Sequence, residues 1–169
     1  MKLRLFAGLR RAARASAVRI GPVQICTPFL LCTVWFMLLL WDSSDFLALG
    51  LAASLWHELG HLLCYALLYR RFPPVKITLW GIGLELGGEP LSAGRVLLLA
   101  AAGPGMNLAG AGVCLLLMRR RLTVRLAALF SANVLVGGFN LLPLPPLDGF
   151  RIATALAALV REKLHFGPE

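Results

Sequence analysis

Residues 46–69, FLALGLAASLWHELGHLLCYALLY, decide how this chain folds. The stretch is apolar along most of its length, and as a helix rising 1.5 Å per residue it is long enough to cross a hydrocarbon core of about 30 Å. Its notable ionisable side chains are His57, Glu58 and His61. Such groups are costly in lipid, and a cluster of them within one span usually lines a functional site. We therefore predict a membrane-spanning helix that carries a polar site.

The composition of the whole chain also describes a membrane protein. Of its 169 residues, 59% are hydrophobic and only 15% are charged, and the mean hydropathy is +0.78. These values exclude a disordered chain, a disulfide-stapled secreted module and a soluble nucleic-acid-binding domain. The basic residues that precede the first apolar run are typical of a segment that binds a lipid surface. We expect the lipid bilayer, and no nucleic acid, as a partner.

Three further apolar stretches accompany this helix, and they predict spans over residues 22–41, 95–118 and 126–142. Residues 70–90 contain prolines and glycines that favour a short β-hairpin or a re-entrant loop. The predicted fold class is an all-α membrane protein with about four transmembrane helices, a membrane-associated hairpin or loop, and a C-terminal interfacial helix.

We expect a single domain, residues 1–169. Residues 1–21 form a retained basic anchor, 22–149 the transmembrane core and 150–169 the interfacial helix. With the N-terminus in the cytoplasm, four spans place 13 of the 17 Lys and Arg residues on the cytoplasmic side and 4 outside. Because positive loops stay on the cytoplasmic side, this orientation is predicted, although it places Arg119–Arg125 outside.

His57-Glu58-Leu59-Gly60-His61 matches the H-E-x-x-H pattern on a predicted helix. Residues four apart lie on one helix face, so both imidazoles can bind one Zn²⁺. Glu58 lies about 100° round the helix from His57 and can act on a water without binding the metal. The alternative is two histidines that are merely hydrogen-bonded inside a helix bundle, which three ionisable residues in five positions make less favourable.

A catalytic zinc ion needs a third protein ligand and an open position. Asp148 is the best candidate, because it follows a proline-rich stretch, 143–147, in which an apolar span must unwind. Its alternative role is the N-cap of the next helix. Cys64 shares the histidine face but lies about 10 Å along the helix from His57, which makes it an unlikely ligand. The other candidates are Glu85, Glu89, Asp42, Asp45 and His165.

These residues resemble the signature of the site-2 protease family of intramembrane zinc metalloproteases. The family pairs H-E-x-x-H in one span with a later N-x-x-P-x-P-x-L-D-G segment, which matches Asn140–Gly149. Between the two, residues 103–107, GPGMN, are similar to the family's G-P-x-x-N stretch. Because no PDZ domain is inserted between the motifs, the chain resembles the short branch that includes the sporulation protease that processes a sigma-factor precursor.

The resemblance implies that His57, His61 and Asp148 hold one zinc ion per chain and that Glu58 is the catalytic base. It implies a membrane-embedded endopeptidase that hydrolyses a peptide bond in or next to the membrane segment of a membrane-tethered protein. The activity would be regulated intramembrane proteolysis through a zinc-polarised water. The resemblance also favours a bacterial cytoplasmic membrane as the location.

Two asparagines and the predicted hairpin are candidates for contact with the substrate. Asn107 and Asn140 could donate hydrogen bonds to the substrate backbone or to the oxyanion, or could instead join helices. Residues 77–86 could hold an unwound substrate segment as an added strand, or could form a loop that only fills the bundle. The alternative function is a non-proteolytic membrane scaffold that retains the zinc-site fold, and the intact Glu58 favours the enzyme.

Overall fold

The computed structural model describes residues 18–26, 28–78, 81–84 and 91–165. The chain divides into two compact units, Met1–Ser43 with Phe72–Glu89, and Ser44–Arg71 with Pro90–Glu169. The first unit contains a small sheet and helix α2 (Pro28–Trp41). The second unit contains four helices and the predicted metal ligands His57, His61 and Asp148, so the candidate site is described within this unit alone.

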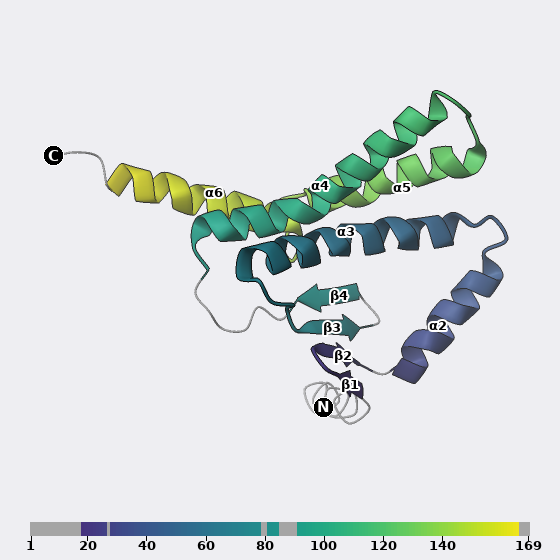
Figure 1. Cartoon of the computed structure of the whole chain (residues 1–169), viewed down its shortest axis with the longest axis horizontal. Coiled ribbons are helices and arrows are strands. Elements are labelled where there is room, and N and C mark those ends of the chain that lie inside the picture. The colour runs from purple at the N-terminus through teal and green to yellow at the C-terminus, as the bar shows by residue number, and fades with distance from the viewer. Residues whose placement is uncertain (1–17, 27, 79–80, 85–90, 166–169) are drawn as a thin grey trace, which may run out of the picture. The chain divides into compact units, whose positions relative to one another are not determined.

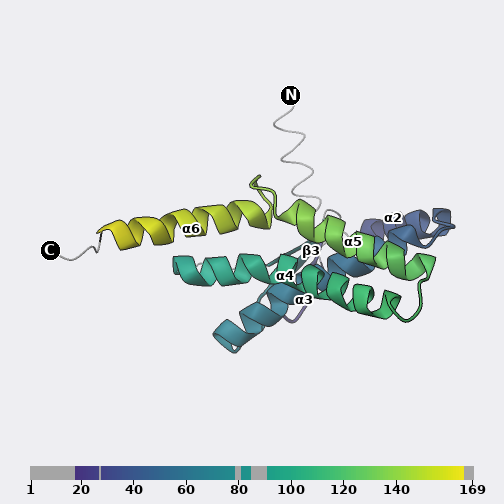
Figure 2. The ribbon, with the colours of Figure 1, turned by 90° about the horizontal axis from the view of Figure 1, so that it is seen from above.

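The second unit is a helical bundle built around one central helix. Its helices are α3 (Phe46–Tyr69), α4 (Ala93–Met118), α5 (Val124–Asn140) and α6 (Asp148–His165). Helix α4 packs against α3, α5 and α6, and α3 also packs against α5 (Figures 1 and 2). Small residues allow this close packing: a Cβ atom at Gly60 would collide with the Ala102 carbonyl, and one at Gly137 would lie 2.9 Å from the Asn107 Cβ.

Two of the four predicted spans are long enough to cross a membrane. Helix α3 has 24 residues and coincides with the predicted range, and α4 has 26 residues. Helices α2 and α5 are apolar but have only 14 and 17 residues. The structure is therefore mostly helical, with two candidate membrane-spanning helices and a small sheet.

The predicted first span, 22–41, is wrong at its N-terminal end. Residues Val18–Ile20 and Val23–Ile25 form strands β1 and β2, and helix begins only at Pro28. The two strands pair antiparallel across a turn in which Gly21 adopts φ +57°, a conformation that favours glycine. The repeated Val-x-Ile pattern around Gly21-Pro22 was the missed signal, because alternating apolar residues on both sides of a turn predict a hairpin.

The predicted hairpin within 70–90 is confirmed as strands β3 (Val75–Thr78) and β4 (Gly81–Leu84). It is part of a four-stranded sheet with the order β1-β2-β3-β4, in which β2 and β3 run parallel and the other pairs are antiparallel. Strand β4 pairs only with β3 among the described residues and is therefore an edge strand. The expectation of an all-α fold is corrected by this sheet.

The helical path breaks between α5 and α6, as the prolines predict. Residues 141–147 are non-helical and include a cis peptide bond between Pro145 and Pro146. Backbone N–H groups of Leu144 and Leu147 donate to carbonyls two and three residues earlier, which closes the segment into tight turns. A Cβ atom at Gly149 would collide with the Leu141 carbonyl, so only glycine allows this return of the chain. Asp148 begins α6 and is buried.

Candidate metal centre

Three predicted ligands meet at one buried point of the bundle. His57 and His61 lie one turn apart on α3, and Asp148 lies at the start of α6. The Nε2 atoms of the two histidines are 3.2 Å apart, and Asp148 Oδ2 lies 3.0 Å from His57 Nε2 and 3.1 Å from His61 Nε2. All three residues are buried, with between 4% and 7% of their surface exposed. No other group of three potential ligands is found in the part of the chain that the structure describes.

The hydrogen bonds around the two imidazoles fix which ring nitrogens carry protons. His61 Nδ1 lies 2.8 Å from the Leu99 carbonyl oxygen, which can only accept, so Nδ1–H donates. Asn107 Nδ2 donates to the Ala53 carbonyl, which leaves Asn107 Oδ1 to accept from His57 Nδ1–H at 2.6 Å. Neutral imidazoles protonated at Nδ1 present lone pairs at Nε2. Both lone pairs are therefore available where Asp148 Oδ2 lies.

The geometry of these atoms fits a tetrahedral metal ion. With bonds of about 2.0–2.2 Å, two ligand atoms of a tetrahedral zinc ion lie about 3.3–3.6 Å apart, slightly more than the separations of 3.0, 3.1 and 3.2 Å found here. Two lone pairs and a carboxylate oxygen repel one another at such distances unless a cation lies between them. Nitrogen and carboxylate ligands suit Zn²⁺, and three protein ligands leave a fourth position open. His57, His61 and Asp148 thus form a candidate zinc site.

Glu58 is next to this cluster but is not part of it. It is half-buried on α3 and lies within electrostatic range of both histidines, Asp148 and Arg151. Its side chain makes no hydrogen bond to another described residue. The carboxylate is thus adjacent to the candidate zinc site and free to accept a proton, as its position one residue after His57 predicts.

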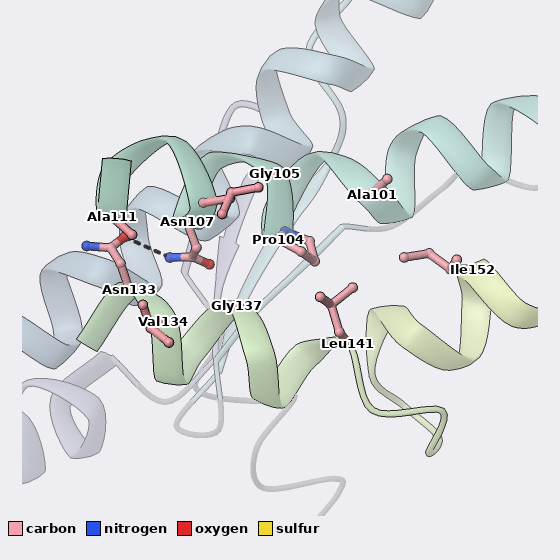
Figure 3. Close-up of a pocket in the computed structure, with 11 residues that line it drawn as sticks. Ala101, Pro104, Gly105, Asn107, Ala111, Asn133, Val134, Gly137, Leu141 and Ile152 are labelled. Atoms are coloured by element: carbon pink, nitrogen blue, oxygen red, sulfur yellow. Dashed lines mark hydrogen bonds between the residues drawn. The ribbon is translucent and has the colours of Figure 1, made fainter. Parts of the chain in front are cut away.

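Asn107 orients the His57 ring through a hydrogen bond to Nδ1, the ring nitrogen that does not face Asp148. Besides accepting from the imidazole, its amide donates to the Ala53 carbonyl at 3.0 Å. It also donates to Asn133 Oδ1 at 3.0 Å (Figure 3). Asn133 in turn donates to the Leu129 carbonyl within α5. Because metal-binding histidines are held by the partner of their second nitrogen, this chain of amides fixes the orientation of His57. Asn133 was missed by sequence reasoning, and its signal was a polar side chain in the middle of an apolar helix.

An apolar cavity of about 340 Å³ lies beside Asn107, between α4, α5 and α6 (Figure 3). We call it the central cavity. Its lining includes Pro104, Leu141 and Ile152, and the two buried asparagines lie at one side. The amide groups of Asn107 already have partners, so the cavity presents mostly hydrocarbon to an occupant.

The other candidate site residues are not brought to the cluster. Asn140 donates to the Val136 carbonyl of its own helix. Cys64 is partly exposed and is not in the ligand group, and Asp45 forms an ion pair with Arg125 at 2.6 Å. Asp42 belongs to the other unit. Three candidates lie outside the residues or side chains that the structure describes, namely Glu85, Glu89 and His165.

Comparisons with known proteins give one sequence match and one structural match. No protein-family profile matches the chain. The chain is 37% identical over 117 residues to "Putative zinc metalloprotease Rip3" of Mycobacterium tuberculosis, in each of two strains. This match covers 62% of the chain but only 29% of Rip3. The site-2 protease from Methanocaldococcus jannaschii superposes with a TM-score of 0.60 and 24% identity, over 90% of this chain and 74% of that protein.

The fold and the buried ligand cluster together define a membrane-type helical scaffold with a candidate metalloprotease centre. More particularly, the chain has the fold of a site-2 protease, and the resemblance to that family that its motifs indicate is confirmed. The chain spans less than a third of the length of this curated relative.

Gly103→Ala is expected to lower zinc occupancy strongly, because a Cβ atom there would lie 2.6 Å from His57 Nε2 and closer still to His61 Nε2. The imidazoles would have to move, and such overpacking costs about 1–3 kcal/mol. Zinc per chain, measured by mass spectrometry of the metal, checks this. Gly105→Ala on the same helix is the matched control, since nothing lies within 4 Å of its added carbon. Zinc occupancy in Gly103→Ala equal to that of wild type would contradict the close approach of Gly103 to the two imidazoles.

Proposed function

We propose that this protein is an intramembrane zinc endopeptidase that cleaves a membrane-tethered protein in or next to its membrane segment. The observation that carries the proposal is the convergence of His57 Nε2, His61 Nε2 and Asp148 Oδ2 within 3.2 Å of one another, with Glu58 beside them. A scaffold protein would need neither three acceptor atoms at one point nor a carboxylate beside them.

In the proposed mechanism, His57, His61 and Asp148 hold the zinc ion and Glu58 moves the protons. When bound, zinc supplies Lewis acidity, which polarises a carbonyl oxygen and makes a nearby water a stronger acid. The Glu58 carboxylate takes a proton from the attacking water and returns it to the leaving amide nitrogen. Asn107 keeps the His57 ring in place through Nδ1, which makes it a positioning residue in this proposal and not a group that contacts substrate.

The membrane setting of the proposal is four spans with a cytoplasmic N-terminus in a bacterial membrane. Helices α3 and α4 supply two spans by length and composition, and the shorter apolar helices α2 and α5 would supply the others, as a bilayer can thin at short helices. His57 lies near the middle of α3, about 16 Å from its first residue. The central cavity beside Asn107 suits the apolar side chains of a membrane segment.

The activity is tested by adding the purified chain to detergent-solubilised membrane proteins of its source and mapping new N-termini by mass spectrometry. New termini are expected within or next to apolar segments. They should disappear when a zinc chelator is present and return when zinc is restored, because removing the metal removes its Lewis acidity. New termini confined to soluble loops, or cleavage that persists in chelator, would count against the proposal.

The hairpin supports a second step of the proposal, in which an unwound substrate segment pairs with the edge strand β4. Leu84→Pro removes one backbone donor from that strand and is expected to slow cleavage by up to about 10-fold, the value of roughly one hydrogen bond. Leu84→Ala keeps the donor and should cleave normally. Thr78→Pro interrupts β3, which pairs on both sides, and should be at least as harmful. Normal cleavage in both proline variants would leave the hairpin as a structural element only.

A further inference from the structure

A second cavity lies at the turn between α4 and α5, away from the zinc ligands. We call this cavity, of about 430 Å³, the arginine cavity. Its lining combines leucines, of which Leu49 and Leu129 are half-buried, with the exposed Arg120, Arg121 and Arg125. We call the leucines its floor and the arginines its rim. Leu49 is eight residues before His57, about 12 Å along α3, so the arginine cavity is separate from the zinc site. Its volume lies within the range of small-molecule sites.

Of the three rim arginines, only Arg125 has a carboxylate partner among the described residues. Arg125 pairs with Asp45 at 2.6 Å, and this ion pair joins the start of α5 to the start of α3. The guanidinium groups of Arg120 and Arg121 have no hydrogen-bond or ion-pair partner within the described ranges. Two arginines beside one small cavity therefore present several donors to an anion, and the planar guanidinium matches the oxygens of a phosphate.

The leucines of the cavity and the apolar surface near it suit a hydrocarbon chain as a ligand. The cavity lies at one end of α3 and α4, the two helices long enough to cross a membrane. Leu116 and Leu122, which are next in sequence to lining residues Leu117 and Arg121, are exposed to 61% and 75%, so this turn also presents apolar side chains at the surface. A free phosphate ion would gain nothing from these leucines. A phospholipid combines both chemistries in one molecule, with an anionic phosphate for the arginines and an acyl chain for the leucines.

We propose that the arginine cavity binds the headgroup of an anionic phospholipid, with Arg120 and Arg121 at the phosphate and the first acyl carbons on the leucine floor. Net negative charge is required because the rim is positive, so a zwitterionic lipid binds more weakly. The site would hold the α4–α5 turn at the membrane surface and is independent of the proposed proteolysis.

The proposal is tested by native mass spectrometry of the detergent-purified full chain with phosphatidylglycerol or with phosphatidylcholine of the same acyl chains. Wild type is expected to retain one phosphatidylglycerol and little phosphatidylcholine. The double variant R120Q/R121Q should bind phosphatidylglycerol about 30-fold more weakly, given the usual contribution of each basic residue at an anionic lipid surface. R161Q/K163Q removes the same charge from the exposed part of α6 and should bind as wild type does.

Three results of the lipid experiment would overturn the proposal. They are equal retention of the two lipids, undiminished binding in R120Q/R121Q, and equal loss in R161Q/K163Q, which would mean that net charge alone matters. Millimolar inorganic phosphate added as a competitor separates the sources of the anion, since full competition would identify a phosphate site without a lipid. Leu129→Trp keeps every arginine and narrows the floor, so it should also weaken retention, and it serves as the test if R120Q/R121Q does not fold.

Discussion

Asp148→Ala is expected to reduce bound zinc from about one ion per chain to a small fraction, and His57→Ala should do the same. Asp148 Oδ2 lies 3.0 and 3.1 Å from the two histidine nitrogens, and no other carboxylate of a described residue reaches that point. Loss of a partner that only orients a ligand already costs 10–100-fold in metal affinity. Loss of a ligand itself should therefore cost more than about 100-fold.

The measurement is zinc per chain by elemental mass spectrometry on protein purified in detergent and dialysed against a weak chelator. Asp45→Ala is the matched control, because it removes an aspartate whose partner is Arg125 and which lies 12 residues before His57, about 18 Å along α3. Full zinc in Asp148→Ala together with loss in His57→Ala would mean that another group, Cys64 or Glu85, is the third ligand. If the wild-type protein folds well and binds no zinc, the endopeptidase hypothesis is rejected and the scaffold hypothesis remains.

Glu58→Gln is expected to lower cleavage by at least about 100-fold while zinc binding remains. The substitution keeps the size of the side chain and removes its ability to accept a proton, and general-base catalysis typically contributes 10²–10⁴-fold. Zinc should stay because Glu58 lies beside the ligand group and is not one of its three members. Rate and zinc content measured on the same preparation separate chemistry from metal binding.

Glu162→Gln is the matched control for this experiment, since Glu162 is an exposed carboxylate on α6. Cleavage that continues in Glu58→Gln would reject Glu58 as the base. Simultaneous loss of zinc would instead make Glu58 a ligand. Retained zinc and substrate binding without cleavage is the expected combination, and it also provides a trap for identifying the substrate.

Local pattern was sufficient to predict most of the helical path. The second span coincides with α3 to the residue because a long apolar run between polar turns has one way to satisfy its backbone in lipid. The first helix begins later than predicted, because residues 22–25 are apolar enough for helix or strand. Their pairing with β1 across the Gly21 turn, and with β3 about 50 residues later in the chain, selects the strand. A partner strand so distant in sequence leaves little trace in local periodicity.

The sequence by itself determined the membrane class, the two histidines on one helix face, the Glu58 carboxylate beside them and the unwound segment that carries Asp148. These follow from hydrophobicity, helical spacing and the constraints of proline, all of which are local. Only the tertiary structure decided which acidic residue meets the histidines and what Asn107 does. Asn107 lies 50 residues from His57 and Asp148 lies 91 residues from it, and their meeting depends on close packing at Gly103 and Gly149. Such contacts are set by the shapes of packed surfaces, which no single stretch of chain contains.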